Sequence, residues 1–279
     1  MIINGETSVY GIIGYPVKHS KSPIFQTKAF EYLGINAVYI PFEVKPENLE
    51  SAIKGLKALS VKGVNVTIPH KEEVIKYINE ISQEAKIIKA VNTLKIIDGY
   101  IIGYNTDAYG FITGLKEVEP DLSGKTALVL GAGGASRAVI YSLITEGVKI
   151  YIANRTKAKV EQIIDDFKTL TKYITDFIQY IEFYRIEEIL KEVDIIINTT
   201  SVGLKDEDPE LFDYSRIEKK HIVVDIIYKE TKLLKKAKEI GCKYQDGLPM
   251  LIYQGAKSFE IWTGKKAPIE IMKNSISMY

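Results

Sequence analysis

Apolar runs alternate with amphipathic stretches over the first hundred residues. Short apolar runs predict strands at 9–13, 38–44 and 63–68, and Pro41 favours a sheet edge for the second of them. Helical spacing of apolar residues predicts helices at 22–33, 46–59 and 71–78. Residues 93–97 and 100–104 predict a hairpin because Asp98-Gly99 supports a tight turn. This alternation predicts a mostly parallel sheet covered by helices.

The same alternation continues in the rest of the chain. A helix is expected at 107–118, followed by strands at 126–130, 148–153, 194–197 and 222–226. Further helices are expected near 156–170, 186–191 and 231–240, at 248–262, and again after Pro268. We therefore expect an α/β protein of two domains. Residues 1–106, rejoined by 248–279, form the first domain, and residues 107–247 form a doubly wound, Rossmann-like second domain.

A glycine-rich turn follows the expected strand at 126–130. It contains Gly131, Ala132, Gly133, Gly134 and Ala135, and an amphipathic stretch runs from Ala138 to Glu146. A strand, a glycine turn and a helix in this order place backbone N–H groups around a pyrophosphate. Gly131 permits the tight turn and Gly133 a close approach of the phosphate. Ser136, at the third glycine position, is small enough for close helix packing.

The strand end that selects between the two nicotinamide dinucleotides carries no carboxylate. NAD-specific sites usually place Asp or Glu there to bind the ribose 2′-hydroxyl. Here Asn154, Arg155 and Thr156 occupy the place, followed by Lys157 and Lys159. A guanidinium can bind a 2′-phosphate through two hydrogen bonds, so this segment indicates NADP(H). The alternative is that Arg155 is a solvated loop residue and Thr156 only caps the next helix.

Composition narrows the class of protein. The 279 residues carry a net charge of +1, which argues against nucleic acid or an acidic membrane as a partner. No apolar run is long enough to span a bilayer, and we see no signal peptide. The single cysteine, Cys242, excludes an internal disulfide and fits a reducing cytoplasm. The three histidines lack metal-ligand spacing, so no metal is expected.

Several polar residues can carry chemistry, although each also has a purely structural interpretation. Lys71 follows a strand and is either a surface lysine or a group that exchanges a proton with a substrate oxygen. Asp107 is a helix N-cap or a partner of such a group. Ser22 caps the helix that begins at Pro23, or the hydroxyls of Ser20 and Ser22 receive a substrate carboxylate at this helix start. The residues alone indicate a two-domain, NADP-binding protein that reduces a small molecule.

The chain resembles the NADP-dependent shikimate dehydrogenase family over almost its whole length. The matching segments occur in the family's order. They are 11–23, 63–71, 90–93, 103–107, 131–135, 154–156, 198–203, 246–247 and 253–256. The resemblance implies reversible, NADPH-dependent reduction of the ring ketone of 3-dehydroshikimate to shikimate, in aromatic amino-acid biosynthesis. It also implies a homodimer formed through the first domain. The C-terminal stretch is placed to return to the first domain, which predicts a cleft between the domains in which the substrate faces the nicotinamide.

The resemblance also assigns roles to individual residues. Ser20 and Ser22 would bind the substrate carboxylate, with Thr67 and Tyr228, while ring hydroxyls would contact Asn65, Asn92, Asp107 and Gln254. Lys71 and Asp107 would form the catalytic pair, and the family leaves open which of them moves the proton. Ile226 and Gly247 would flank the nicotinamide. The glycine turn and the segment from Asn154 to Lys159 would hold the rest of NADP.

Three rival functions remain at this point. The first is a relative that also oxidises quinate, with NAD. The second is a non-catalytic NADP-binding sensor or partner module, which has no reason to keep Lys71, Asp107, Asn92 and Gln254 together. The third is a dehydrogenase of folate one-carbon units, which does not account for the paired serines at 20 and 22.

Overall fold

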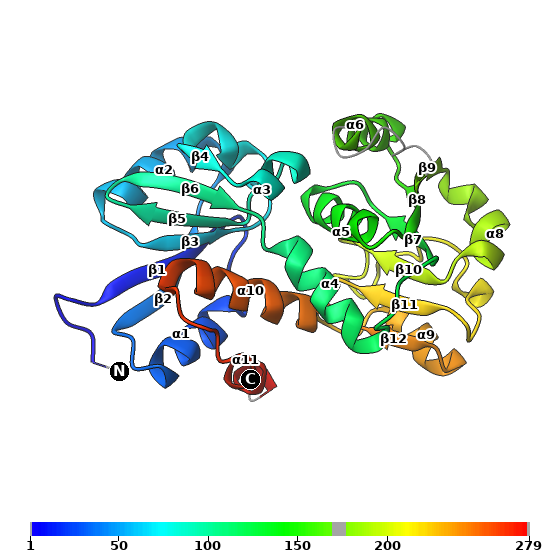
Figure 1. Cartoon of the computed structure of the whole chain (residues 1–279). Helices are drawn as coiled ribbons and strands as arrows, with labels where there is room; N and C mark the ends of the chain where they lie inside the picture. The colour runs from blue at the N-terminus through cyan, green and yellow to red at the C-terminus, as the bar shows by residue number, and fades with distance from the viewer. Residues whose placement is uncertain (1, 169–176, 278–279) are drawn as a thin grey trace. The chain divides into compact units, whose positions relative to one another are not determined.

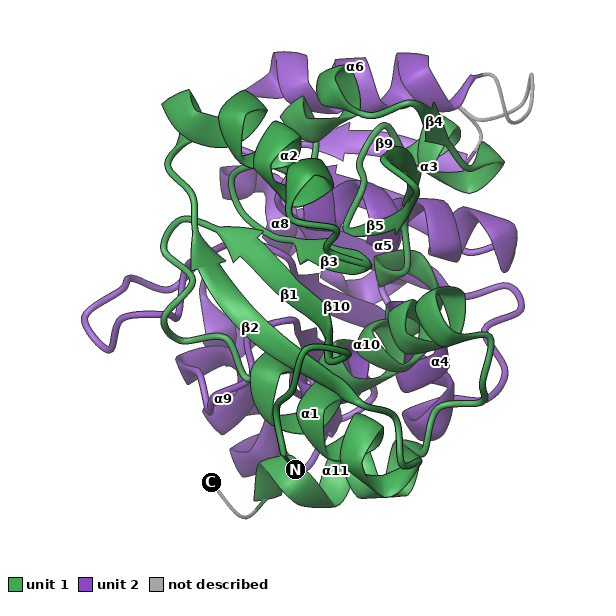
Figure 2. Ribbon diagram, turned by 90° about the vertical axis from the view of Figure 1, so that its left-hand side faces the viewer, with its two compact units in different colours: residues 1–110, 251–279 green, residues 111–250 purple. Residues whose placement is uncertain are grey.

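Two compact units make up the chain. The computed structural model describes residues 2–168 and 177–277. Contacts divide the protein into a first unit, Met1–Gly110 with Leu251–Tyr279, and a second unit, Phe111–Met250 (Figure 2). The divisions fall inside the helices 107–118 and 248–263, whereas the sequence suggested the first residues of these helices as the boundaries.

The first unit is built around a six-stranded sheet. Its strands are β1 (Ser8–Gly14), β2 (Ala37–Glu43), β3 (Gly63–Val66), β4 (Glu80–Ile81), β5 (Thr93–Ile97) and β6 (Tyr100–Tyr104). Its helices are α1 (Ser22–Tyr32), α2 (Leu49–Ala58), α3 (Gln83–Ile88), the start of α4 (Asp107–Val118), most of α10 (Leu248–Thr263), and α11 (Ile269–Ser277). The strand order is β2-β1-β3-β5-β6-β4.

The register of this sheet agrees with most of the sequence pattern. β1 pairs in parallel with β2 and β3, and β4 pairs in parallel with β6. The hairpin β5–β6 brings in two antiparallel pairs, β3–β5 and β5–β6, so the sheet is mixed. β2 is an edge strand, as the missing N–H of Pro41 led us to expect.

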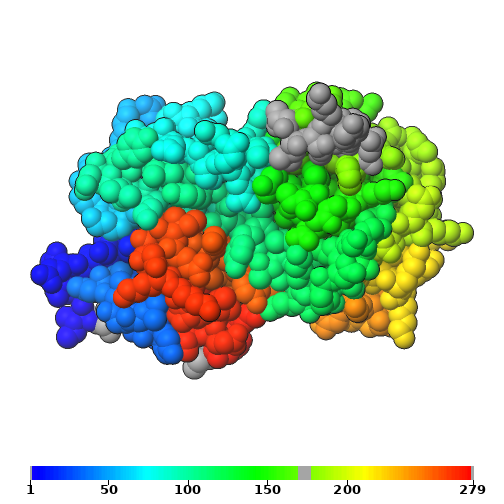
Figure 3. Space-filling model, in the orientation of Figure 1, coloured from blue at the N-terminus to red at the C-terminus, as the bar shows by residue number. Residues whose placement is uncertain are grey.

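Apolar side chains cover both faces of the first sheet. α2 contributes Ile53 and Leu56 to a core that includes Val64 and Leu94 from the strands. Other helices bring aromatic residues together, and Phe30 of α1 lies 4.9 Å from the ring of Tyr10 and 5.1 Å from that of Phe259 on α10. The last helix, α11, packs on α1, and Figure 3 shows the red C-terminal residues beside the blue ones. The end of the chain therefore completes this unit.

The second unit contains a sheet whose strands all pair in parallel. Its strands are β7 (Thr126–Leu130), β8 (Lys149–Ala153), β9 (Ile178–Ile181), β10 (Ile195–Asn198), β11 (Ile222–Asp225) and β12 (Lys243–Gln245). Its remaining helices are α5 (Gly134–Thr145), α6 (Lys157–Phe167), α8 (Ile186–Ile189) and α9 (Lys232–Ile240).

The strand order β12-β11-β10-β7-β8-β9 is that of a doubly wound dinucleotide fold (Figure 1). The chain starts at β7, moves outward through β8 and β9, and returns to β10 on the other side of β7. Ligands of such sheets bind at the carboxyl ends of the strands, where the order reverses. In this unit the reversal lies between β7 and β10. The core on one face packs α8 and α9 against Leu128, Ile196 and Val223.

Some elements differ from the sequence-based expectation. The strands β4, β9 and β12 and the helix α3 were not predicted. The helix expected at 71–78 is a 3-10 helix, Glu73–Tyr77, because the chain must leave it to pair Glu80 with Ile102 of β6. The strand expected to reach residue 68 ends at Val66, and α5 begins at Gly134, before Ala138. The end of the helix expected near 156–170 lies outside the described residues.

Candidate active site

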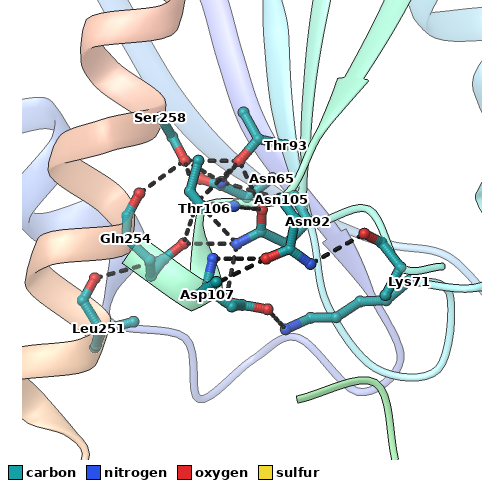
Figure 4. Close-up of polar contacts among 12 residues, drawn as sticks. Asn65, Lys71, Asn92, Thr93, Asn105, Thr106, Asp107, Leu251, Gln254 and Ser258 are labelled. Atoms are coloured by element: carbon teal, nitrogen blue, oxygen red, sulfur yellow. Dashed lines mark hydrogen bonds and ion pairs between the residues drawn. The ribbon is translucent and has the colours of Figure 1, made fainter. Parts of the chain in front are cut away.

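A buried ammonium–carboxylate pair lies at the centre of the candidate site. Lys71 lies in the turn between β3 and the 3-10 helix, and Asp107 is the first residue of α4. Lys71 Nζ donates to Asp107 Oδ2 at 2.5 Å, and the two side chains are only 16% and 6% exposed (Figure 4). Two residues 36 positions apart in the sequence therefore form one ion pair that is largely shielded from water.

Asn92 fixes the orientation of this carboxylate. Its Nδ2 donates to Asp107 Oδ1 at 2.8 Å and lies 2.9 Å from Thr106 Oγ1. Its Oδ1 accepts the backbone N–H of Thr106 at 2.7 Å, which prevents the amide from flipping. Each oxygen of Asp107 thus has its own donor, Asn92 on one side and Lys71 on the other.

Three buried hydroxyls lie behind Asn92. Ser258 Oγ is 2.7 Å from Thr93 Oγ1 and 3.2 Å from Thr106 Oγ1, and it donates to the carbonyl of Gln254 at 3.0 Å (Figure 4). Gln254 Oε1 in turn accepts from Asn92 Nδ2 at 3.2 Å. The sequence did not single out these hydroxyls. Two features of the sequence could have identified them. Thr93 and Thr106 adjoin Asn92 and Asp107, and Ser258 lies one helical turn after Gln254.

Asn65 is held from all sides within the first unit. Its Nδ2 lies 2.9 Å from Ser258 Oγ and 3.1 Å from both Thr93 Oγ1 and the carbonyl of Asn92. Its Oδ1 accepts the hydroxyl of Tyr39 at 2.7 Å, and the residue is 4% exposed. Burial raises the pKa of Tyr39 well above its usual value, so this hydroxyl remains a donor. Asn65 braces the site, and its amide protons are used internally.

The paired serines lie where α1 begins. Lys21 is the N-cap and Ser22 the first helical residue, and the side chain of Lys21 makes no capping hydrogen bond. Ser20 Oγ accepts the backbone N–H of Ser22 at 3.3 Å, while Ser22 is 2% exposed and shares a hydrogen bond with Tyr39. Thr67, directly after β3, is half-buried. The interpretation of Ser22 as an N-cap is therefore wrong.

The structure also contradicts the purely structural interpretations of Asp107 and Lys71. Asp107 does not cap α4: the side chain of Asn105 accepts the backbone N–H groups of Asp107 and Ala108, at 3.0 and 3.3 Å. Lys71 is not a surface lysine, since its side chain is 16% exposed. Nor does Lys71 belong to a helix, because the turn that holds it precedes the 3-10 helix.

In the second unit, the glycine turn joins β7 to α5. Gly131 has φ +114°, and a Cβ there would lie 2.7 Å from Thr199 Oγ1, so only glycine fits. A Cβ on Gly133, the N-cap of α5, would meet no atom within 4 Å. Ser136 is fully buried and donates to the carbonyl of Gly131 at 2.7 Å, so the small residue expected here does pack closely. The open N-terminus of α5, with its free N–H groups, fits a pyrophosphate.

The segment after β8 presents cations at the start of α6. Arg155, Thr156 and Lys159 are exposed, whereas Lys157 pairs with Glu161 at 3.3 Å. Neither Arg155 nor Lys159 forms an ion pair with another described residue. Thr156 is the N-cap of α6 but makes no side-chain capping bond, and Asn154 Nδ2 donates to its carbonyl at 2.9 Å. These residues fit a 2′-phosphate, because free cations and an unused hydroxyl gather at one helix end.

Three further predicted residues follow β11 and β12. A Cβ on Gly247 would lie 2.0 Å from the carbonyl oxygen of Ile226, so these two backbones touch. Tyr228 is 37% exposed and belongs to the second unit, unlike the other residues that the resemblance assigns to the substrate. In the described part of the chain no group of His, Cys, Asp and Glu could hold a metal ion. None of the described helices is long and apolar enough to cross a membrane.

Three family models match the chain. They are described as the shikimate dehydrogenase substrate binding domain (residues 12–94), shikimate/quinate 5-dehydrogenase (114–236), and the shikimate 5′-dehydrogenase C-terminal domain (247–276). Two of the models match the two chain segments of the first unit, and the model for residues 114–236 matches the second unit.

Individual proteins match over nearly their whole length. The chain is 52% identical to the shikimate dehydrogenase (NADP(+)) of Aquifex aeolicus, covering 99% of this chain and 98% of that protein. The crystal structure of the Aquifex aeolicus enzyme has a TM-score of 0.93, with 99% of both chains covered. A shikimate dehydrogenase in complex with NADP+ has a TM-score of 0.94 at 44% identity, covering 99% of this chain and 97% of that one. The sequence matches and the structural matches identify the same family, and the chain belongs to the shikimate dehydrogenase family.

Proposed function

We propose that this protein catalyses the reversible, NADPH-dependent reduction of 3-dehydroshikimate to shikimate. The observation that carries the proposal is the buried Lys71–Asp107 pair, in which each oxygen of the carboxylate has a separate donor. A ketone becomes an alcohol by gaining a hydride on carbon and a proton on oxygen. The pair offers a positioned proton at one atom, Lys71 Nζ, within a polar, sheltered cluster.

The substrate's polar groups match the polar residues of the first unit. The hydroxyls of Ser20 and Ser22 and the start of α1 supply donors suited to the ring carboxylate, and Thr67, directly after β3 in the same unit, supplies a further hydroxyl. The side chains of Asn92, Asp107 and Gln254 suit the ring hydroxyls. Because buried polar groups must find partners, this site should reject analogues that lack a hydroxyl. The resemblance assigns Asn65 to the same hydroxyls, and hydrogen bonds with Tyr39, Thr93 and Ser258 hold its amide in place.

Lys71 performs the proton step in this proposal. In the reduction its ammonium donates a proton to the former ketone oxygen, and in the oxidation the neutral amine takes the proton back. Asp107 holds Nζ through Oδ2, while Asn92 keeps Oδ1 occupied, so the carboxylate remains an acceptor throughout. NADPH, when bound, supplies the hydride.

The second unit holds the cofactor. Its pyrophosphate fits the N-terminus of α5, and its 2′-phosphate fits Arg155, Thr156 and Lys159. A carboxylate that would repel this phosphate is missing from residues 154–156. Ile226 and Gly247, whose backbones touch, flank the nicotinamide.

A steady-state assay tests the proposal directly. We expect the purified protein to oxidise NADPH with 3-dehydroshikimate, to reduce NADP+ with shikimate, and to use NADH much less efficiently. Tight NADPH binding without turnover would favour the sensor instead. Equal efficiency with NADH would remove the role given to residues 154–159.

Quinate is a second candidate substrate, because the family model that matches residues 114–236 covers both shikimate and quinate dehydrogenases. The kcat/KM for quinate, measured beside that for shikimate, decides between a narrow and a broad specificity. We also propose a homodimer, supported by the family resemblance, and a cytoplasmic location, supported by the single, free Cys242. Light scattering on the eluted protein measures the assembly.

A further inference from the structure

A buried carboxylate that the proposed reaction does not use lies at the end of β11. Asp225 is 0% exposed, and its oxygens accept hydrogen bonds from three residues. Asn198 Nδ2 lies 3.1 and 3.2 Å from the two oxygens, the backbone N–H of Ile227 donates at 3.0 Å, and Thr231 Oγ1 donates at 2.8 Å. Burial raises the pKa of Asp225, and these donors oppose that effect. A buried carboxylate with this many hydrogen-bond donors holds the backbone segments that carry those donors in fixed positions.

Asn198 carries the same geometry into a second loop. It ends β10 and is the register partner of Asp225 on β11 and of Leu130 on β7. Its Oδ1 accepts from the backbone N–H and the hydroxyl of Thr200, at 2.9 and 2.7 Å, and its Nδ2 donates to the carbonyl of Val202 at 3.0 Å. One side chain thus shapes residues 198–203 and also holds Asp225.

Thr231 closes the loop that follows β11. Its hydroxyl donates to Asp225 Oδ2 and accepts the backbone N–H of Leu234 at 3.3 Å, so it joins the start of the loop to the start of α9. Ile226 lies inside this closed loop. The carbonyl of Ile227 accepts the backbone N–H of Gly247 at 3.1 Å, and Gly247 has no space for a Cβ beside Ile226. A shift of the loop therefore moves Ile226 and Gly247 together.

These contacts lie at the carboxyl ends of β10 and β11, beside the strand-order reversal where ligands of such sheets bind. We propose that Asn198, Asp225 and Thr231 form a positioning cluster that sets the nicotinamide end of the cofactor site by fixing Ile226 and Gly247. The proposal rests on the proposed function, which assigns the nicotinamide to these two residues. The adenosine end is held by other segments, the glycine turn and residues 154–159.

Two ligands separate this role from a general effect on folding. NADPH occupies both ends of the site, whereas adenosine 2′,5′-bisphosphate has only the adenosine end. Asp225→Asn replaces one carboxylate oxygen by an amide NH2 group, which cannot accept the hydrogen bonds that this oxygen receives. Thr231→Val removes the hydroxyl that donates to Asp225, whereas Thr231→Ser keeps that hydroxyl. We expect the first two variants to raise the Kd for NADPH about tenfold, with the Kd for the bisphosphate unchanged and Thr231→Ser close to wild type. Asp206→Asn, which removes an exposed ion pair with Lys229 on the same loop, is the matched control.

The outcomes are distinct. Equal loss of affinity for both ligands, in either variant, means that the cluster only stabilises the unit and overturns the proposal. Unchanged NADPH affinity in both variants also overturns it. If Asp225→Asn does not fold, the comparison of Thr231→Val with Thr231→Ser still decides. The failure of the proposed function has another signature, since wild-type protein would then bind NADPH without turning over 3-dehydroshikimate.

Discussion

Replacing Lys71 by methionine separates the chemical role of the Lys71–Asp107 pair from its structural role. Methionine keeps an unbranched chain but has no proton to donate. General acid catalysis contributes about a hundredfold or more, so we expect kcat to fall by at least that factor, or about 2.7 kcal/mol in the barrier. Initial rates of NADPH oxidation with 3-dehydroshikimate measure this loss.

The same variant leaves Asp107 without its cation. Loss of one partner of a buried pair costs about 3–5 kcal/mol, and the 16% exposure of Lys71 puts this case near the lower end. At about 2–4 °C per kcal/mol, the Tm should fall by about 6–12 °C in calorimetry. The double variant Lys71→Met/Asp107→Asn should recover most of this stability, because no unpaired charge remains, but none of the activity.

Lys45→Met serves as the control, since Lys45 is exposed in the same unit. An unchanged kcat in Lys71→Met would refute the assignment of the proton step to Lys71. A double variant as unstable as the single one would refute the account of the pair's energetics. Recovery of activity in the double variant would show that the pair matters only for folding.

The remaining predictions concern the second unit. Arg155→Ala should raise the KM for NADPH far more than that for 3-dehydroshikimate and reduce the preference over NADH, as steady-state kinetics with both cofactors will show. Arg137 and Asp166 form a buried pair at 2.5 Å, so Arg137→Met should lower the free energy of unfolding by about 3 kcal/mol, and Arg137→Met/Asp166→Leu should restore it in denaturant titrations. Burial raises the pKa of the Cys242 thiol. The stability that this shift contributes is fully present below the pKa of the thiol in the unfolded chain, about 8.5, and is lost as pH rises through the higher pKa of the folded protein. The free energy of unfolding should therefore decline as pH rises above about 8.5. A pH-independent value, matched by Cys242→Ala, would contradict this.

The sequence predicted the long elements and the order of the second sheet's motifs because their apolar periods are strong. It did not predict β4 or β12, whose two and three residues carry no period and are defined by pairing with β6 and β11. The helix expected at 71–78 failed for a related reason. Local spacing favoured a helix, but strand pairing at Glu80 required the chain to turn away.

The candidate site shows the same division. Lys71, Asp107 and Asn92 were identified through motifs in separate segments, and the structure brings these three side chains into contact. Ser258 and Tyr39 were missed because a buried hydroxyl has no distinctive pattern in the sequence. The role of Ser258 arises when the C-terminal helix α10 packs on the N-terminal sheet, where Trp262 Nε1 also donates to the carbonyl of Leu94 at 2.9 Å. Tyr39 reaches Asn65 from another strand of the same sheet.

The two-segment construction of the first unit also has a consequence for biosynthesis. On the ribosome, the strands β1 to β6 emerge long before α11 and before α10, which supplies Phe259 and Trp262 to their aromatic core. The intervening unit is continuous in sequence and can close its own sheet while translation is still under way. The first unit lacks Phe259 and Trp262 until the final helices leave the exit tunnel, so a nascent chain stalled at residue 250 contains the whole of the second unit but only the N-terminal part of the first.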